Sequence, residues 1–111
     1  MDEFHSRKIK FKAWDTENRL LMRLNAIECN KGELFKKNHI LLQFTGLLDK
    51  EGDEIYDMDI LLVYNDKHLV FWNEETGAWY FCPLGKRNEK KPFLTGDAGR
   101  MRRFCSYFEL S

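Results

Sequence analysis

Cysteine and proline are scarce in this chain, with three cysteines and two prolines among 111 residues. The cysteines are odd in number, lie far apart and form no C-x-x-C pair, so they outline neither a disulfide framework nor a zinc site. Reduced thiols of this kind are typical of a reducing compartment, and we therefore expect a cytoplasmic protein. The three residues are Cys29, Cys82 and Cys105.

The chain also lacks the sequence features of a secreted or membrane-spanning protein. Residues Met1–Lys8 lack the apolar core of a signal peptide. No apolar run approaches the roughly 18 residues that cross a bilayer, so we expect no membrane partner. The length is that of one domain, and we expect residues 1–111 to form a single domain.

Motifs of catalysis and cofactor binding are missing as well. The chain has no glycine-rich phosphate loop, G-x-S-x-G or H-E-x-x-H, and His5, His39 and His68 have no metal-ligand spacing. An acidic stretch begins at Asp49, but an EF-hand loop starting there would have Gly52 fourth instead of sixth. We interpret the stretch as a solvated turn and expect a non-enzymatic protein without metal or cofactor.

The pattern of the chain predicts β-strands over most of its length. Residues 7–13 alternate between apolar side chains and lysines, which indicates a half-buried strand with a solvated lysine face. Further apolar segments are separated by turn residues, as in antiparallel hairpins. We therefore expect a mainly β protein. The further predicted strands cover residues 20–24, 26–29, 33–35, 40–44, 60–64, 68–72 and 78–82.

The predicted hairpin over residues 68–82 is apolar on both faces. With residues 74–77 as its loop, Trp72 faces Trp79 on one side and Phe71 faces Tyr80 on the other. Such a hairpin lies either at the centre of the fold or against another subunit. We therefore expect self-association through part of this surface, with Phe71, Trp72, Trp79 and Tyr80 as candidate contacts.

The charges are unevenly distributed although the net charge is zero. The balance is +2 over residues 1–12, −6 over residues 13–82 and +4 over residues 83–111, which we call the basic tail. Basic groups interleaved with aromatic rings are used to bind single-stranded nucleic acid. The candidate contacts for nucleic acid or another partner are Lys86, Arg87, Lys90, Lys91, Arg100, Arg103 and Tyr107.

The end of the basic tail predicts a short helix. Its apolar residues repeat at i, i+3, i+4 and i+7, with Thr95 or Asp97 as the candidate N-cap. A closing strand over residues 106–110 is the alternative. The residues of this apolar stripe are Met101, Phe104, Cys105 and Phe108.

Two stretches carry a family resemblance, K-F-K-A-W-D at Lys10–Asp15 and LQFTGLLDKEGDEIYDMDI at Leu42–Ile60. Together they resemble the YopX family of small proteins encoded by bacteriophages and by integrated or conjugative elements. The spacing of the second stretch matches without a gap, and the resemblance extends to the hairpin that ends near Phe81. The matching positions, where we expect roles in turns, a bulge and strand ends, are Trp14, Asp15, Thr45, Gly46, Asp49, Gly52, Tyr56 and Asp59.

Met58 departs from the pattern, because the family usually has glycine there. Glycine adopts a positive φ that methionine does not adopt easily. Either the local backbone differs in this chain, or the family's glycine has an ordinary conformation.

The resemblance implies a β-rich, barrel-like fold with some helix and assigns no catalytic residue. We therefore expect a mainly β (β-rich α+β) fold, a small barrel-like antiparallel sheet with a short C-terminal helix. The leading hypothesis is an interaction or accessory protein of a phage or conjugative element that binds itself or another protein. The alternative is a nucleic-acid-binding protein that uses the basic tail.

Overall fold

The computed structural model describes residues 10–24, 29–30, 33–34 and 38–110 of the chain. The predicted strands over residues 7–13, 26–29 and 33–35 lie partly outside these ranges. The helical elements are α1 (Thr95–Ala98) and two 3₁₀ turns, η1 (Arg87–Glu89) and η2 (Tyr107–Glu109). The strands are β1 (Phe11–Asp15), β2 (Leu20–Leu24), β3 (Cys29–Asn30), β4 (Glu33–Leu34), β5 (His39–Leu48), β6 (Glu54–Tyr56), β7 (Asp59–Val63), β8 (Asp66–Asn73), β9 (Ala78–Pro83), β10 (Lys91–Pro92) and β11 (Arg102–Ser106).

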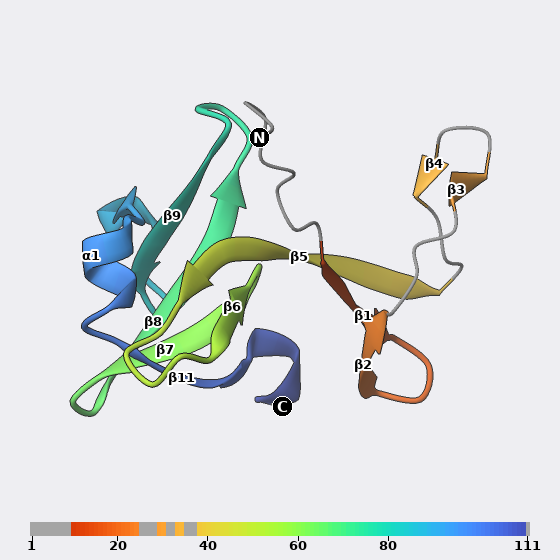
Figure 1. Ribbon diagram of the computed structural model, residues 1–111, viewed down its shortest axis with the longest axis horizontal. Helices are drawn as coiled ribbons and strands as arrows, with labels where there is room; N and C mark the ends of the chain where they lie inside the picture. Colours follow the sequence, from red (N-terminus) through yellow and green to blue (C-terminus); the bar gives the residue numbers. More distant parts are fainter. Residues whose placement is uncertain (1–9, 25–28, 31–32, 35–37, 111) are drawn as a thin grey trace, which may run out of the picture.

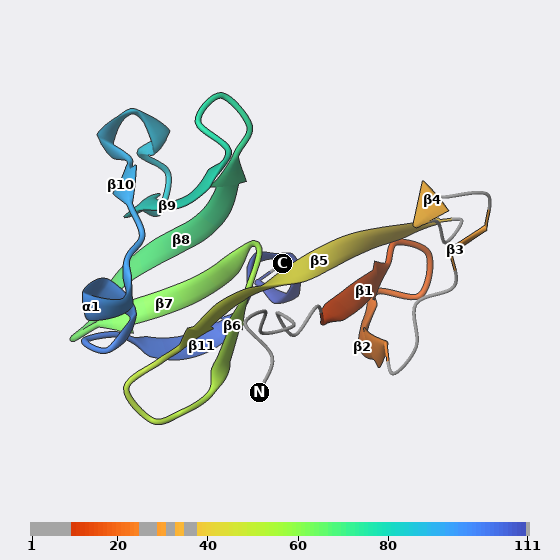
Figure 2. The same cartoon turned by 45° about the horizontal axis from the view of Figure 1, so that its top comes forward.

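Most strands belong to two antiparallel sheets, which confirms the prediction of a mainly β fold (Figure 1). A five-stranded sheet with the order β10-β9-β8-β7-β11 curls into a half-barrel, and a four-stranded sheet has the order β2-β1-β5-β6. Figure 2 shows the long strand β5 reaching from β6, beside the five-stranded sheet, to β1 and β2 at the other end of the molecule. Strands β3 and β4 form a separate hairpin. None of the helical elements in the described ranges has the length and apolar character needed to cross a membrane.

A bulge interrupts β5 at Thr45 and Gly46, where its register against β6 shifts. Gly46 has a φ of +87°, a conformation that glycine adopts without a steric penalty. The Thr45 hydroxyl donates to the Ile55 carbonyl (2.8 Å) and accepts from the N–H of Leu47 (3.1 Å). The side chain thus satisfies polar groups at the point where the ladder is irregular.

Two turns follow this bulge. The turn predicted in the acidic stretch is present, and Gly52 closes it at a φ of +88°, but Asp49 is buried, so the prediction of a solvated turn is wrong at that residue. Between β6 and β7, Met58 has a φ of +65°. The backbone at the position of the family's glycine is therefore left-handed in this chain, in spite of the methionine side chain.

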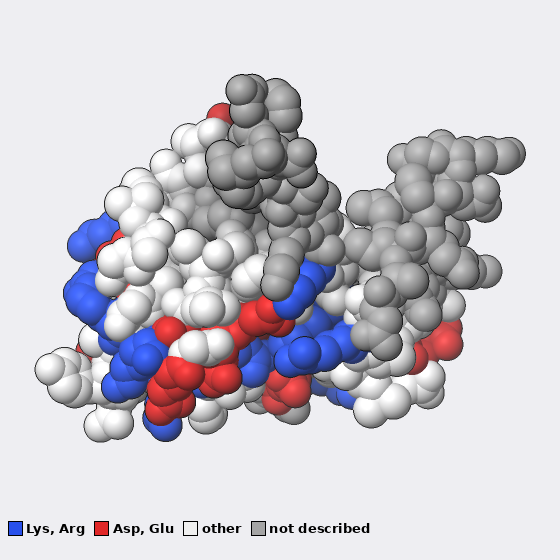
Figure 3. Space-filling model, in the orientation of Figure 1, with Lys and Arg blue, Asp and Glu red and all other residues white. Residues whose placement is uncertain are grey.

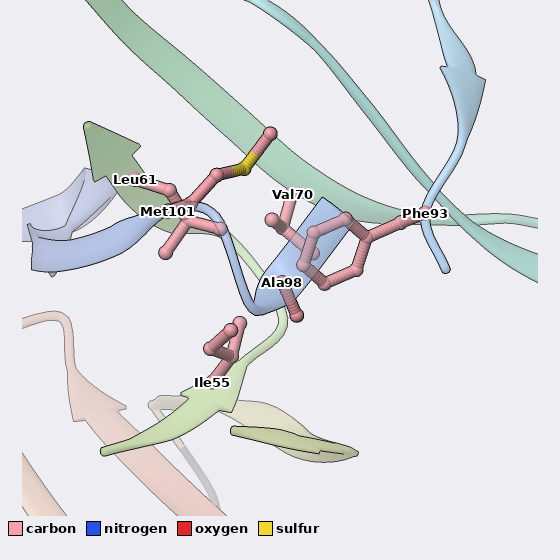
Figure 4. Packing of buried hydrophobic residues seen from close by; sticks show 6 residues of the cluster. All are labelled: Ile55, Leu61, Val70, Phe93, Ala98 and Met101. Carbon is pink, nitrogen blue, oxygen red and sulfur yellow. The ribbon is translucent and has the colours of Figure 1, made fainter. Parts of the chain in front are cut away.

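The β8–β9 hairpin has the predicted register, with Trp72 opposite Trp79 and Phe71 opposite Tyr80. It lies inside the five-stranded sheet, with β10 and β7 on its two sides, and each of its faces contributes side chains to a hydrophobic cluster, so it is central to the fold. The outer core, on the second face, comprises Ile60, Leu69, Phe71 and Cys82. The inner core, on the face toward β6 and α1, comprises Ile55, Leu61, Val70, Phe93, Ala98 and Met101 (Figure 4).

The short helix is present but not where the apolar stripe predicted it. Helix α1 precedes the stripe, whereas residues 102–106 form β11 and pair with β7. A bulge between Arg103 and Cys105 adds a residue to β11 and breaks its strict alternation of sides. The apolar residues therefore fall on a helical spacing by accident. The alternative, a closing strand, has the right type but ends at Ser106 instead of beginning there.

Candidate functional site

Asp59 lies at the centre of a buried polar network that joins β1, β6, β7 and β11. It is 1% exposed. One of its carboxylate oxygens accepts the backbone N–H of Tyr56 (2.8 Å) and the Nε–H of Arg103 (2.8 Å). Burial raises the pKa of Asp59, and the Arg103 guanidinium opposes this rise. Because Asp59 is buried and Arg103 is largely buried, much of the attraction between them offsets the cost of removing the charges from water.

Asp49 holds the same strand from the β5–β6 turn. One of its oxygens accepts the N–H groups of Glu51 (2.9 Å) and Asp53 (2.8 Å), and the other accepts the backbone N–H of Arg103 (2.7 Å). Burial raises the pKa of Asp49, but these backbone donors outweigh burial and hold the pKa below its ordinary value. Asp49 and Asp59 of the family motif thus both bind Arg103 of the C-terminal strand, Asp59 through its side chain and Asp49 through its backbone.

Lys12 is buried, so the prediction of a solvated lysine face is wrong at this position. Its ammonium lies 4.4 Å from the centre of the Tyr56 ring, a cation–π contact. Burial, followed by the nearby charge of Arg103, lowers the pKa of Lys12, while the Asp59 carboxylate opposes this. Strand β1 is paired on both sides, by β2 and β5, and all five of its residues are buried.

The first motif stretch has its own contacts. The Trp14 ring stacks on the Phe108 ring, with 5.7 Å between centroids and 22° between planes. The Asp15 carboxylate accepts the backbone N–H groups of Asn18 (3.0 Å) and Glu17 (2.9 Å), and hydrogen bonds from Asn18 lower the pKa of Asp15. All eight motif positions therefore lie in turns, in the β5 bulge or in contacts between strands.

The acidic turn offers little to a cation. The carboxylates of Asp49, Glu51 and Asp53 come within 4.8 Å of one another. One oxygen of Asp49 accepts two N–H groups and the other accepts the N–H of Arg103, so most of its acceptor capacity is used by the fold. The spacing of the turn does not match an EF-hand, and its geometry gives no further support for a calcium site.

The four hairpin aromatics do not form one exposed surface. Phe71 is 6% exposed and lies under the Arg87 guanidinium, 4.6 Å from the ring centre. Trp72 and Trp79 pack edge to face, and Trp72 remains 42% exposed. Tyr80 is half-buried. Only Trp72 among the four is an exposed apolar side chain.

The seven candidate contacts of the basic tail do not lie on one surface either. Lys91 in β10 and Arg103 in β11 occupy opposite edges of the five-stranded sheet, about 19 Å apart along it at the usual strand spacing. Arg103 is paired with Asp59, and Arg100 is paired with Asp97 at 2.7 Å. On the face drawn in Figure 3, basic and acidic side chains are interleaved in one band.

Strand β2 is an apolar edge that the sequence reasoning did not single out. Its sequence is LLMRL, and in the described part of the chain it pairs only with β1. Leu20 is 57% exposed. Two shallow grooves, of about 320 and 420 Å³, share Trp14, Arg19 and Phe108, and only the second reaches β2, at Leu20 and Leu21. Their apolar lining comprises Trp14, Leu20, Leu21, Tyr107, Phe108 and Leu110. The sequence signal that could have indicated this edge was an apolar run at residues 20–24 without the alternation of a half-buried strand.

Comparisons with known proteins agree with this description of the fold. The chain is similar to the crystal structure of protein EF1440 from Enterococcus faecalis, with a TM-score of 0.66 and 21% identity over 94% of this chain and 96% of that one. Curated proteins contain no match. The sequence profile described as YopX protein matches residues 22–101, from β2 through α1 and so well into the basic tail. Because the match covers most of the chain, the protein belongs to the YopX family.

Proposed function

We propose that this chain is a non-enzymatic interaction protein of a bacteriophage or conjugative element and that it associates with itself through β2. The observation that carries the proposal is the outer edge of β2, which is unpaired within the described residues and flanked by apolar side chains. An edge strand presents a row of N–H and C=O groups, and soluble proteins usually protect it with charges, proline or a covering element. In β2, only Arg23 is charged.

A second copy of the chain fits this edge. Two β2 strands paired antiparallel across a two-fold axis make every contact twice, as a closed dimer requires. With Met22 at the axis, Leu20 of one copy lies opposite Leu24 of the partner subunit, and Leu21 lies opposite Arg23. Main-chain hydrogen bonds would supply affinity and the flanking apolar side chains would supply specificity.

The grooves beside β2 support the same proposal. Tyr107 and Leu110, which line the first groove with Trp14, are 44% and 38% exposed. The second groove reaches Leu20 and Leu21, so apolar surface contributed by η2 adjoins the strand that would pair. Together, the free strand edge and this surface favour a copy of the chain over a small polar ligand.

Size-exclusion chromatography with light scattering, over a wide concentration range, tests the proposal. We expect twice the monomer mass at high concentration and the monomer mass for Leu20→Lys, because a lysine at an exposed edge position blocks strand pairing. Leu48→Lys is the matched control, since Leu48 is 49% exposed but lies at the far end of β5. A strict monomer at every concentration, or a dimer that survives Leu20→Lys, would eliminate self-association through β2.

The association with a mobile element rests on the family to which the chain belongs. The genes that flank its coding sequence test this part separately. Neighbours that encode phage structural proteins or conjugation proteins would support it, and a setting of chromosomal housekeeping genes would contradict it.

A further inference from the structure

A second surface lies at the end of the molecule opposite β2, around the tight turn between β7 and β8 (Figures 1 and 2). It is an open pocket of about 520 Å³ built from three segments of the chain. These are the β5–β6 turn, the end of β7 and the connection from α1 to β11. Its polar and aromatic lining comprises Lys50, Glu51, Tyr64, Arg100 and Arg102.

Two backbone contacts bring the basic residues of this pocket together. The N–H of Lys50 donates to the carbonyl of Met101 (2.9 Å), and the N–H of Arg103 donates to the Asp49 carboxylate (2.7 Å). The β5–β6 turn therefore lies along residues 101–103. As a result, Lys50 in the family motif and Arg102 in the basic tail line one pocket although 52 residues separate them.

The pocket carries basic groups that the fold does not use. Lys50 and Arg102 are exposed, and their side chains form no ion pair or hydrogen bond with the described residues. Arg100 is neutralised by Asp97, and Glu51 supplies one negative charge. An anion that enters the pocket therefore meets two free cations.

Tyr64 is the most unusual residue of the pocket. It is 94% exposed, and it occupies the first position of the two-residue turn between β7 and β8 with a φ of +55°. Hairpin turns usually have glycine or asparagine where φ is positive, because a larger side chain there is strained. The ring gains no burial to offset this strain. Such an outlier points to a surface role outside the fold.

We propose that this pocket binds single-stranded nucleic acid, with a base stacked on the Tyr64 ring and adjacent phosphates bound by Lys50 and Arg102. An exposed aromatic ring beside unpaired basic groups provides both components that single-strand binding needs, a platform for a base and charges for the backbone. An anionic peptide or a free phosphate would use the cations but would leave the ring without a partner. The pocket does not depend on the β2 edge, and a β2 dimer would present it twice.

Fluorescence anisotropy with short labelled oligonucleotides of DNA and RNA, single- and double-stranded, tests this proposal. We expect single-stranded binding that weakens about sevenfold between 50 and 200 mM salt, as two phosphate contacts predict. Tyr64→Gly should weaken binding about five- to a hundredfold by removing the stacking. Lys50→Ala combined with Arg102→Ala should weaken it and reduce the salt dependence.

The controls separate a local site from a general charge effect. Tyr64→Gly removes strain at an exposed position, so its midpoint of thermal unfolding should equal or exceed that of the natural protein. Lys90→Ala combined with Lys91→Ala removes the same charge at the opposite sheet edge and should leave binding unchanged. A free mononucleotide serves as a competitor.

Each contrary outcome would overturn the proposal. These outcomes are no binding at low salt, equal binding by Tyr64→Gly, and equal losses in the two double variants. A preference for duplex would mean that the basic side chains attract phosphates in general and that no base stacks on the Tyr64 ring. Complete displacement by a mononucleotide at a concentration equal to that of the oligonucleotide would assign the pocket to a free nucleotide instead of a strand. Binding of DNA and RNA alike, or of one of them, supports the proposal when it requires Tyr64.

Discussion

Asp49→Asn tests most directly how the family turn holds the C-terminal strand. One oxygen of Asp49 accepts two N–H groups of its own turn, and the other accepts the N–H of Arg103 at 2.7 Å. An asparagine keeps one carbonyl oxygen for the turn but presents its NH₂ group to the Arg103 N–H. Because Asp49 is 5% exposed, water cannot readily replace the lost acceptor, and β11 should be held less tightly.

The magnitude follows from these contacts. Losing a hydrogen bond to a charged group costs about 1.5–3 kcal/mol, and weakening the two remaining bonds adds about 1 kcal/mol. We expect Asp49→Asn to lower the free energy of unfolding by about 3 kcal/mol. A chain of 111 residues unfolds with an entropy of about 0.23 kcal/mol/K, so the midpoint of thermal unfolding should fall by about 13 °C. Urea unfolding followed by tryptophan fluorescence, together with thermal unfolding by circular dichroism, measures both quantities.

Asp53→Asn is the matched control. Asp53 belongs to the same turn, but its side chain is exposed, so the same substitution should change the free energy of unfolding by less than about 0.5 kcal/mol. If Asp49→Asn destabilised the protein no more than Asp53→Asn, the role assigned to Asp49 would be refuted.

The effect should also depend on pH. Burial raises the pKa of Asp49, but the backbone donors from Arg103 and Asp53 outweigh it and lower the pKa below its unfolded value. A carboxyl of this kind stabilises the fold fully above its unfolded pKa, and the stabilisation is lost as pH falls through the folded pKa. The difference between the natural protein and Asp49→Asn should therefore stay constant near neutral pH and shrink below about pH 4. A difference that grows on acidification would contradict this account.

Two further predictions concern other parts of the motif. Gly46→Ala should lower the free energy of unfolding by about 1–2 kcal/mol, because the φ of Gly46 is +87°. Gly96→Ala in α1 should be neutral or stabilising. Both sites have open space for a Cβ, so the two variants differ in backbone conformation and not in crowding. Equal effects in urea unfolding would show that backbone strain at the bulge is not responsible. Asp59→Asn should cost about 3 kcal/mol by removing the closer of the two carboxylates beside the Arg103 guanidinium, and adding Arg103→Met should recover part of the loss. A double-mutant cycle measures this coupling, and strict additivity would mean that the pair does not act as a unit.

Elements with a local pattern could be predicted from the sequence. The register of the β8–β9 hairpin follows from a loop of fixed length, which determines that Trp72 and Trp79 face each other. The turn from Asp49 to Gly52 follows from residue types within four positions. The candidate site was harder to predict from the sequence, because the composition shows which side chains are basic but not which of them remain unpaired in the fold. Arg103 looked like a free surface charge and is bound to Asp59.

The sequence by itself determined the mainly β class, the register of the β8–β9 hairpin and the family. Only the tertiary structure decided that the end of the chain is a strand, that Lys12 is buried, and that Lys50, Tyr64 and Arg102 line one pocket. The reason is physical. A hairpin's partners are a few residues apart and leave a readable period, whereas β11 depends on pairing with β7, some forty residues earlier. A bulge in that pairing removed the only local signal that β11 could have shown.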